Sequence, residues 1–581
     1  MKFKALAVDY DGTIAQDGIL DPDVRIAIAE ARTRGIIFVL VTGRVLVDLE
    51  RAAGELDFAD AIVAENGAVL EFPNRYSRLI GSPAPVPFLD ELRQRGIPFT
   101  TGQCVVEADA KSAQQILAVI RELELPLMLL FNRSRLMVLP QGVSKSVGLR
   151  QALSALHLSR HNTIAIGDAE NDHDLLATCE LGVAVAWGSK SLQRVADQVL
   201  EGNGPAAVAP FIRQSAHEIR LPPTRIGRYS IALGKREDGS NADLSIRGRN
   251  LLVSGDSHSG KSWVTGLTCE RLILQGYSVC VVDPEGDYRA LDTLPGIVVF
   301  GGEDPPPQLP DLARALRHPE MGAVIDLSHV RSKSKIDYLY SLLPMLASLR
   351  RATGLPHRIV IDEAHYFLHG PHAADLLDLS LNAYTLVTYR VSDLNAGILR
   401  TIEATIVNRT SDPNEVQALH AMAGGQDSVA HWTQVLEGLA VNQAVILPNT
   451  QEAAGRLCRV DLSPRITSHV RHKAKYLDVQ LIEEQGFVFT QDSKPCGTSA
   501  RTLKQFISLL RTCPWSVLEG HMRQGDFSRW INNVFHDRIL ADNIRKLEER
   551  CRAGDLHGLS CALVTVIQER YEVSPEIPIL D

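Results

Sequence analysis

Residues 5–13 of this 581-residue chain read ALAVDYDGT, and this stretch decides the fold of the N-terminal part. The apolar run from Ala5 to Val8 predicts a buried strand, and Asp9 and Asp11 follow at its end. Side chains two residues apart share one face of a strand. Both carboxylates are therefore expected at the carboxyl edge of a sheet, where α/β proteins bind ligands. Taken alone, the segment would equally suit a solvated turn, because Asp and Gly are common turn residues.

Polar residues follow two further predicted elements in the same part of the chain. The strand 36–41 ends in Thr-Gly-Arg at 42–44, which places a hydroxyl and backbone N–H groups at the same sheet edge. Lys145 stands just before a predicted helix, where its charge would neutralise a phosphate. The strand 163–166 runs into GDAEND at 167–172, which adds carboxylates suited to a hard cation such as Mg²⁺. These segments together favour a ligand site over a turn.

The order of these four motifs resembles the haloacid dehalogenase superfamily of phosphatases. It is most similar to the sugar-phosphatase branch, in which a cap is inserted between the second and third motifs. The resemblance covers residues 1–214, with the cap at about 75–140. It implies an α/β fold, with a Rossmann-like core that carries a small α+β cap, and the cap would select the substrate.

The resemblance also implies roles for individual residues. Asp9 would be the nucleophile that takes the phosphoryl group, and Asp11 the general acid and base. Mg²⁺ would be bound by Asp9, the Asp11 carbonyl and Asp168, and Asp172 would anchor this metal site from behind its ligands. The phosphoryl group would be bound by Thr42, Gly43 and Lys145. A fold that has lost its activity is the alternative. Because no catalytic position is replaced, an active phosphatase is favoured.

A second phosphate site is predicted farther along the chain. The strand-like residues 250–254 lead into GDSHSGKS, which matches the phosphate-loop pattern GxxxxGK[ST], and a helix-compatible stretch follows. In that context backbone N–H groups cradle phosphates, Lys261 reaches the β- and γ-phosphates, and the Ser262 hydroxyl binds Mg²⁺. The predicted ATP-binding residues are Gly255, Asp256, Ser257, His258, Ser259, Gly260, Lys261 and Ser262.

An apolar strand at 358–361 runs into Asp362 and Glu363, which suits a Walker B site. Asp362 would orient the Mg²⁺ shell, and Glu363 would activate the attacking water. Together with the segments at 278–288, 384–390 and 406–413, this set resembles the FtsK/HerA superfamily, closest to HerA-like ring ATPases. The resemblance covers about 228–465, within an expected ATPase domain of 215–465.

This second resemblance implies a RecA-like domain in a hexameric ring that moves duplex DNA. Arg409 or Arg390 would be the arginine finger that acts on a neighbouring subunit, although either is equally well interpreted as a surface arginine. Two features depart from the family. Tyr389 stands where a polar sensor glutamine is usual, and the N-terminal phosphatase stands in place of the usual small β-barrel.

Net charge, apolar runs and cysteine spacing narrow the classes of protein to which the chain can belong. The net charge of −9 gives no chain-wide basic surface, so any DNA contact would use a local one. No apolar run approaches the roughly 18 residues that a membrane span needs. The nine cysteines form no CxxC pair, and no signal peptide is evident, so a cytoplasmic protein with reduced thiols is expected. Residues 466–581 are expected to form a mostly helical accessory domain.

Three hypotheses stay open at this point. The first is a bifunctional enzyme that joins a Mg²⁺-dependent phosphatase to a HerA-like ring ATPase, with ATP and DNA as partners and a bacterial defence role as one setting. The second is a polynucleotide kinase–phosphatase that repairs nucleic-acid ends. The third is a phosphatase clustered on a nucleotide-gated scaffold that does not turn over. The phosphatase substrate, a phosphorylated small molecule or a nucleic-acid end, is not decided by the sequence.

Overall fold

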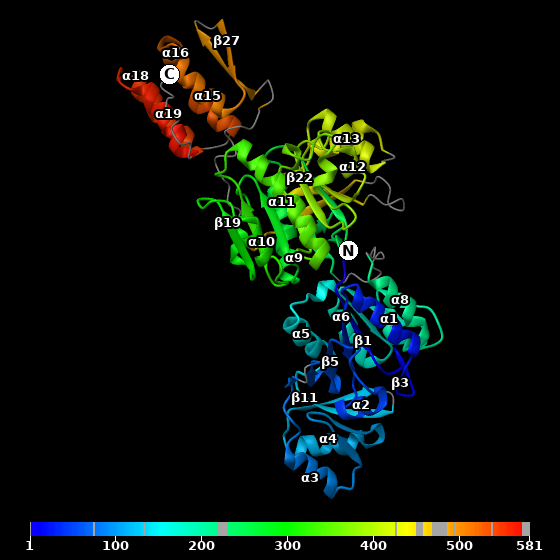
Figure 1. Ribbon diagram of the computed structural model, residues 1–581. Coiled ribbons are helices and arrows are strands. Elements are labelled where there is room, and N and C mark those ends of the chain that lie inside the picture. The colour runs from blue at the N-terminus through cyan, green and yellow to red at the C-terminus, as the bar shows by residue number, and fades with distance from the viewer. Residues whose placement is uncertain are drawn as a thin grey trace. The chain divides into compact units, whose positions relative to one another are not determined.

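A computed structural model gives the fold of the chain (Figure 1). The residues it describes are 2–73, 76–132, 134–217, 229–424, 427–448, 457–467, 481, 485–491, 494–535 and 538–571. By contacts the chain divides into two compact units, and each is described by itself. The first consists of Met1–Pro284 and Leu291–Ser468, and the second of Glu285–Ala290 and His469–Asp581.

The first unit begins with an eight-stranded sheet that is parallel from β14 to β5 and antiparallel at its β6–β7 end. In spatial order the strands are β14 (Gln198–Leu200), β13 (Leu181–Val185), β12 (Thr163–Gly167), β1 (Ala5–Asp9), β4 (Ile37–Val41), β5 (Ala61–Ala64), β6 (Val69–Glu71) and β7 (Ser77–Leu79). A hairpin of β2 (Ala15–Gln16) and β3 (Ile19–Leu20) follows β1. The apolar runs at residues 5–8, 36–41, 61–64, 163–166 and 182–186 predict strands, and all five are present within about one residue.

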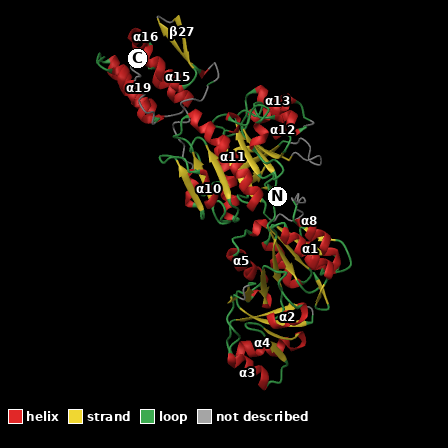
Figure 2. Cartoon of the chain, in the orientation of Figure 1, coloured by secondary structure: helices red, strands yellow, loops and turns green. Residues whose placement is uncertain are grey.

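Helices cover both faces of this sheet, as the red helices beside the yellow strands show in Figure 2. Leu6 and Val8 of β1 belong to one apolar core, and Ala5 and Ala7 belong to another on the opposite face. The alternation follows from the two-residue period of a strand, and burial on both faces is typical of parallel sheets. The helices are α1 (Pro22–Thr33), α2 (Leu46–Ala53), α5 (Lys145–Ala155), α6 (His173–Thr178), α7 (Lys190–Val195) and α8 (Val208–Ser215).

The Gly- and Pro-rich segments 201–210 and 220–227 predict a linker, but α8 begins inside the first of them at Val208. Pro205 opens a short 3-10 turn just before the helix, which proline tolerates at a helix start. Val208 and Ile212 are buried in the core beside α1, and this burial explains why a Gly- and Pro-rich segment continues into a helix. The other part of the expected linker, 220–227, lies outside the described residues.

The cap is a separate small α+β layer inserted between β7 and α5. Its antiparallel strands run in the order β10 (Leu127–Asn132), β11 (Arg135–Pro140), β9 (Val106–Asp109) and β8 (Phe99–Thr101). Its helices are α3 (Val86–Gln94) and α4 (Ala113–Glu122), which pack on this sheet around a core of their own. Strand β7 pairs with the main sheet, so the elements of the cap span residues 86–140.

A second, eleven-stranded sheet completes the first unit. Its order is β16 (Asn241–Leu244), β15 (Ile231–Arg236), β25 (Cys458–Leu462), β24 (Gln443–Pro448), β23 (Ile402–Val407), β17 (Asn250–Ser254), β22 (Tyr384–Thr388), β21 (Arg358–Ile361), β18 (Val279–Asp283), β20 (Gly322–Asp326) and β19 (Ile297–Gly301). The strands are parallel from β23 to β19 and antiparallel from β24 to β16. The helices are α9 (Lys261–Leu274), α10 (Leu309–Ala315), α11 (Ser332–Thr353), α12 (Ala396–Leu399), α13 (Pro413–Ala423) and α14 (Val429–Glu437).

Buried polar contacts join the two sheets within this unit. Arg247, which precedes β17, pairs through Nε with Oε1 of Glu180 at 2.9 Å, and the Tyr277 hydroxyl donates to Oε2 of the same carboxylate at 2.9 Å. The Asn162 side-chain amide contacts the His357 ring at 3.1 Å between Oδ1 and Nε2. All these residues stand just before strands, so the two sheets meet at the amino ends of their strands.

The second unit is mostly helical, as expected, with one strand pair. It contains β26 (Phe487–Gln491), β27 (Lys494–Ala500), α15 (Leu503–Thr512), α16 (Trp515–Gln524), α17 (Asp526–Trp530), α18 (Arg538–Arg552) and α19 (Leu559–Arg570) around an apolar core. His521 Nδ1 lies 2.7 Å from Asp526 Oδ2, and its Nε2 accepts the backbone N–H of Thr490 at 2.9 Å. Because both ring nitrogens are engaged, this histidine packs and orients the unit.

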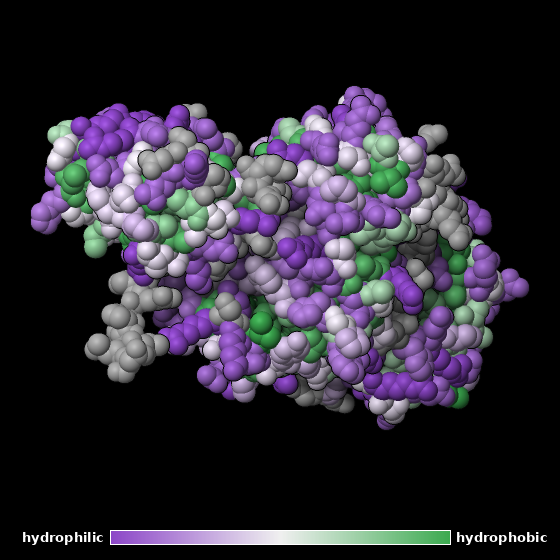
Figure 3. Space-filling view, turned by 90° about the horizontal axis from the view of Figure 1, so that it is seen from above, coloured by the Kyte–Doolittle hydropathy of each residue, from purple (hydrophilic) through white to green (hydrophobic). Residues whose placement is uncertain are grey.

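The surface is mainly polar in the face that Figure 3 shows, where purple hydrophilic residues predominate and green hydrophobic residues form small groups. Among the described residues, no helix combines the length and the apolar character that a bilayer crossing requires.

Candidate functional site

The first site lies at the carboxyl edge of the N-terminal sheet. Asp9 ends β1, Asp168 follows β12 directly, and the two strands are neighbours. Lys145, the first residue of α5, donates from Nζ to Oδ1 of Asp9 at 2.5 Å and to Oδ1 of Asp172 at 2.6 Å. Four residues that the sequence predicted for one site are therefore in contact there, and all four side chains are buried.

The loop after β12 is shaped by Asp172. Its Oδ2 accepts the backbone N–H groups of Asp168 and Ala169, each at 3.0 Å, which closes the loop on itself. Gly167 is required here, because a Cβ at this position would lie 2.6 Å from Cγ of Asp172. The Thr13 hydroxyl lies 3.4 Å from Oδ2 of Asp9 and from Oδ1 of Asp168, so it also bridges β1 and this loop.

The electrostatics of the cluster are dominated by its acidic groups. Burial raises the pKa of Asp9 well above its usual range, the charges of Asp172 and Asp168 add to this effect, and Lys145 opposes it. Burial disfavours the charged form of Lys145, but Asp172 and Asp9 outweigh it and raise the pKa of the ammonium. One lysine thus faces three carboxylates, and a cation would balance the remaining negative charge.

The donor set fits Mg²⁺. One oxygen from each of Asp9, Asp168 and Asp172 lies within 4.8 Å of the other two. Within the part of the chain that the structure describes, this is the single group of three or more His, Cys, Asp or Glu side chains so arranged. Mg²⁺ prefers hard carboxylate oxygens and retains several waters, so three carboxylates at the open edge of a sheet suit it better than they suit a softer metal.

Asp11 lies beside this cluster but is held by a residue to which the sequence assigned no role. Arg44 donates from Nε and Nη2 to the two carboxylate oxygens of Asp11, both at 2.6 Å. Such a two-point contact fixes the orientation of a carboxylate. Thr42 is buried, and its hydroxyl accepts the backbone N–H of Arg44 at 3.1 Å, so the segment 42–44 forms a tight turn at the sheet edge. In the sequence, the signal for this role was the arginine that directly follows Thr42 and Gly43.

Glu65 is a second residue that sequence reasoning missed. It follows β5 at the same sheet edge, is fully buried, and accepts the backbone N–H groups of Gln103, Cys104 and Val105 at 2.8, 2.8 and 3.1 Å. One carboxylate thus ties the core to the cap segment before β9. The polar triplet 65–67 after a predicted strand was the only signal in the sequence.

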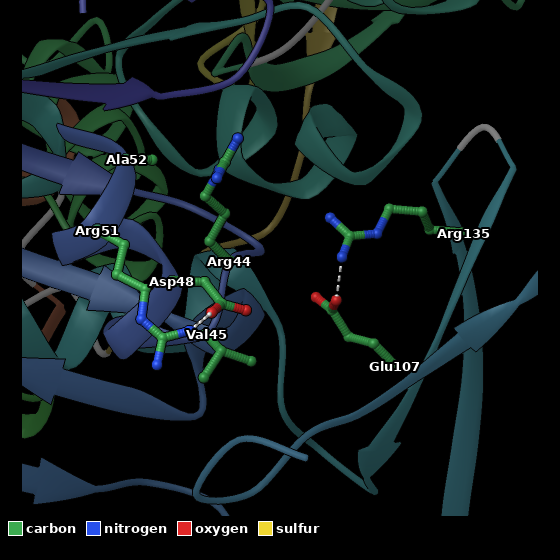
Figure 4. A pocket seen from close by; sticks show the side chains of 7 residues that line it. All are labelled: Arg44, Val45, Asp48, Arg51, Ala52, Glu107 and Arg135. Carbon is green, nitrogen blue, oxygen red and sulfur yellow. Dashed lines mark hydrogen bonds and ion pairs between the residues drawn. The ribbon is translucent and has the colours of Figure 1, made fainter. Parts of the chain in front are cut away.

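A cavity of about 310 Å³ opens between the core and the cap next to Asp11. Figure 4 shows Glu107 and Arg135 from the cap strands on one side, with the residues around the start of α2 on the other. Its lining is Arg44, Val45, Asp48, Arg51, Ala52, Glu107 and Arg135. Arg135 pairs with Glu107, whose carboxylate is buried and has its pKa raised by that burial. The lining is predominantly charged, so a polar ligand fits it.

Comparison with known families identifies this part of the chain. Residues 6–80 and 89–212 match the model of haloacid dehalogenase-like hydrolases. The N-terminal part is a haloacid dehalogenase-like hydrolase domain. The short gap in the match, residues 81–88, falls where the chain passes from β7 into the cap.

Individual relatives agree with this assignment. The hydrolase domain is 29% identical over 214 residues to phosphoglycolate phosphatase 2 of Saccharolobus solfataricus, which covers 35% of this chain and 88% of the relative. It is 29% identical over 229 residues to a phosphoglycolate phosphatase of Methanopyrus kandleri, covering 36% and 96%. A crystal structure of a haloacid dehalogenase-like hydrolase from Bacteroides thetaiotaomicron matches 37% of this chain and 99% of its own, with 19% identity and a TM-score of 0.33. The hydrolase domain is thus similar, over most of their length, to phosphatases of this superfamily.

The second site lies outside the hydrolase domain, at the carboxyl edge of the eleven-stranded sheet. Residues 255–262 connect β17 to α9, the strand–loop–helix context that a phosphate loop requires. Lys261 begins α9, and its Nζ donates across the loop to the carbonyl of Asp256 at 2.8 Å. Gly260 has a φ of 104°, and a Cβ there would lie 2.6 Å from the carbonyl oxygen of Val441.

Asp362 and Glu363 are close to this loop through the sheet. They follow β21, which is separated from β17 only by β22, so both residues stand at the same carboxyl edge as the loop. Both are buried, and Glu363 adopts a left-handed φ of 47°. A non-glycine residue in that region costs backbone energy and often marks a functional position.

Several buried polar atoms at this edge have no hydrogen-bond partner among the described residues. They are Ser254 Oγ at the end of β17, Ser259 Oγ in the loop, His365 Nε2 after Glu363 and Asn408 Oδ1 after β23. Buried polar groups are nearly always satisfied in native proteins, so their concentration at one edge indicates a place for a polar ligand or ordered water.

The two predicted arginine-finger candidates differ in exposure. Arg390 is exposed, lies 3.5 Å from Asp393 through Nη1, and stacks its guanidinium 5.4 Å from the ring centroid of Tyr389. Arg409 is half-buried, and its carbonyl accepts the N–H of Asp256 at 2.8 Å. Arg409 thus supports the loop of its own chain through its backbone, while the Arg390 side chain is open to solvent.

Proposed function

We propose that the hydrolase domain cleaves phosphate monoesters through an aspartyl-phosphate at Asp9. An Asp9 carboxylate oxygen attacks phosphorus, the new O–P bond forms, and the P–O bond to the leaving alcohol breaks as Asp11 donates a proton to that oxygen. A water molecule then gives its proton to Asp11 and attacks the same phosphorus, and the Asp9–P bond breaks. Mg²⁺ held by Asp9 and Asp168 with the Asp11 carbonyl, and supported by Asp172 through those ligands, would supply charge neutralisation.

Three other residues support this chemistry from fixed positions. Lys145 holds a positive charge against Asp9, where phosphoryl oxygens would gather. In the turn containing Thr42 and Gly43, the Thr42 N–H already donates to the Val63 carbonyl at 2.8 Å, so the Gly43 N–H would be the backbone donor to the same oxygens. Arg44 orients Asp11, and a leaving group that contacted Arg44 would free the Asp11 carboxylate to transfer its proton.

The substrate is proposed to be a small, polar phosphorylated molecule. The cavity next to Asp11 is at the low end of the range for small-molecule sites, and it carries arginine and acidic side chains. The two relatives compared above are phosphoglycolate phosphatases, which adds support for a small anionic phosphate ester. A nucleic-acid end is the less favoured alternative because the cavity lies beneath the cap.

For the second sheet we propose an ATP site that hydrolyses its nucleotide. The carrying observation is the concentration of unpartnered buried polar atoms around a glycine-bounded loop that ends in Lys261. Ser262 and Asp362 would hold Mg²⁺ with the phosphates, and Glu363 would activate the attacking water. The strand order, with one strand between the loop strand and the strand that leads to Asp362, supports this proposal.

A HerA-like assembly is the corresponding proposal for the whole chain. Subunits would form a ring, most simply a hexamer, that acts on duplex DNA, and the exposed Arg390 is better placed than Arg409 to reach a neighbouring subunit. Tyr389, at the position of the usual sensor, favours the scaffold hypothesis as the second candidate, in which nucleotide controls assembly without turnover. A kinase–phosphatase has no comparable support from the arrangement around the loop.

The decisive measurement is phosphate release by the full chain from ATP, with and without duplex DNA, and from 2-phosphoglycolate. Asp9→Asn should abolish release from the small ester, and Lys261→Ala should abolish release from ATP. Activity on ATP that is lost in Asp9→Asn and kept in Lys261→Ala would contradict the second site. DNA stimulation together with ATP-dependent assembly on a sizing column would support the motor. Assembly without turnover would support the scaffold.

A further inference from the structure

His365 is fixed beside the phosphate loop by the strand that follows Asp362. Its Nδ1 lies 3.1 Å from the hydroxyl oxygen of Thr388, the last residue of β22. The same oxygen accepts the backbone N–H of Arg390 at 2.9 Å. Because that N–H occupies an acceptor position of the hydroxyl, the hydroxyl proton is available to Nδ1. The hydroxyl keeps a second acceptor position, so this geometry suits an Nδ1 that accepts the Thr388 proton as well as one that donates to it, and in both cases β22 sets the ring orientation.

The state of the imidazole follows from its surroundings. Burial lowers the pKa of His365 to about 4, an effect that Glu363 opposes and that Arg390 and Lys261 reinforce. The ring is therefore neutral near pH 7 and carries one proton. Where Nδ1 accepts from Thr388, that proton is on Nε2.

The Nε2–H group has no use within the described part of the chain. It is buried and lacks a hydrogen-bond partner there, although buried polar groups are nearly always satisfied in native proteins. The ring packs against Tyr389 with centroids 4.4 Å apart, and the Lys261 ammonium lies 5.9 Å from the Tyr389 centroid. Glu363 Oε2 is 3.6 Å from Nδ1. The ring thus lies near the predicted water-activating carboxylate, and Tyr389 contacts both this ring and the phosphate-loop lysine.

We propose that His365 donates a hydrogen bond from Nε2 to the terminal phosphate of a nucleoside triphosphate, so that this histidine, held by Thr388, distinguishes triphosphate from diphosphate. The inference rests on the ATP site proposed above. Tyr389 stands where the family has a polar sensor residue. In this proposal the neighbouring Thr388, the last residue of β22, supplies the polar link to the phosphate by holding His365.

Two amide substitutions separate the roles of the ring nitrogens. Glutamine places an N–H donor near the position of Nε2, whereas asparagine reaches only the position of Nδ1. In the full chain carrying Asp9→Asn, which removes the phosphatase, ATP and ADP affinities are measured by calorimetry and phosphate release from ATP is followed. His365→Asn should lower the preference for ATP over ADP by about 10- to 100-fold, as expected for a lost hydrogen bond to a charged group. His365→Gln should stay within about threefold of the parent.

Three outcomes would overturn the inference. The first is a parental preference for ATP over ADP in His365→Asn. The second is an equal loss of ATP and ADP affinity in that variant, and the third is a stronger preference for ATP in His365→Asn than in His365→Gln. Thr388→Val provides a second test if His365→Asn fails to fold: it removes the group that fixes the ring and should reduce the preference for ATP while ADP binding persists. An unchanged preference in that variant would also contradict the inference.

Lys261→Ala in the same background keeps the two proposals apart. If it leaves ATP binding and hydrolysis intact, the ATP site itself fails. If it abolishes both while His365→Asn has no effect on nucleotide preference, only the role of His365 fails. Phosphatase activity of His365→Asn with Asp9 restored reports on folding of the hydrolase domain, and ADP binding by the same variant reports on folding of the second sheet.

Discussion

Lys145 shows how a buried charge is kept at the phosphatase site. The lysine donates to Asp9 and to one carboxylate oxygen of Asp172, and the other oxygen of Asp172 accepts two backbone N–H groups. Asp172 therefore positions both the lysine and Asp168, rather than serving only as a metal ligand.

At this scale we predict that Asp172→Asn weakens Mg²⁺ activation of the phosphatase by about 10- to 100-fold, the usual loss when a supporting group of a metal site is removed. The amide cannot balance the Lys145 ammonium. Excess Mg²⁺ should restore part of the rate. Asp57→Asn, at an exposed pair with Arg25, is the matched control and should leave the Mg²⁺ dependence unchanged. Equal dependence in the two variants would contradict the role given to Asp172.

The sequence contained the acidic residues of this site but not their attachments. Asp9, Lys145 and Asp168 could be placed together because the ends of neighbouring parallel strands converge at one edge. The contact of Arg44 with Asp11, and that of Glu65 with the cap segment, depend on side-chain directions across residues far apart in the chain. No local pattern determines such directions, so these two residues could not be assigned.

The second site is built from loops, and the loop 255–262 depends on a backbone conformation that glycine adopts readily at position 260. Gly260→Ala would force an alanine into a left-handed conformation, which costs about 1–2 kcal/mol, and would press its Cβ against the Val441 carbonyl. We expect the affinity for ATP to fall at least about tenfold, measured by calorimetry, with phosphatase activity unchanged.

Gly520→Ala is the control for this prediction. Gly520 lies inside α16, and nothing stands within 4 Å of a Cβ built there. Alanine is a better helix former than glycine, so this variant should bind ATP normally and should not be less stable than the parent. Similar ATP affinities in the two variants would indicate that the loop is not the nucleotide site.

Element prediction succeeded where strands were apolar and short, and it failed at the edges of the sheets. Strands β17, β21 and β22 were expected from their sequences, whereas β15 and β16 were not. β16 alternates exposed and buried residues on an antiparallel edge, and its polar half dilutes the apolar signal. β16 pairs with β15 in a local hairpin, but the pairing of β15 with β25 brings together segments more than 200 residues apart, which only the folded sheet reveals.

The junction between the two sheets is the feature of the larger molecule that is easiest to test. Arg247 is buried with Glu180 and Asp197, its Nη1 lying 3.4 Å from Asp197. Removing one partner of a buried charge cluster leaves the others uncompensated, so Arg247→Ala should lower the free energy of unfolding by about 3–5 kcal/mol in urea denaturation.

Arg213→Ala supplies the comparison. Arg213 pairs with Asp23 and Glu30 within the hydrolase domain, on the surface, where such pairs contribute at most about 1 kcal/mol. Comparable losses in the two variants would mean that the junction adds no more stability than a surface pair.

The two sheets meet at the amino ends of their strands, and this arrangement affects how a reaction product could move from one site to the other. Each site stands a full strand beyond the junction, and a five-residue strand spans about 16 Å. A phosphate or alcohol released at one edge must therefore pass through bulk solvent before it meets the other edge of the same chain. For any product that one site releases and the other consumes, an isotope label should be diluted by an unlabelled pool, and a trapping enzyme in solution should intercept it.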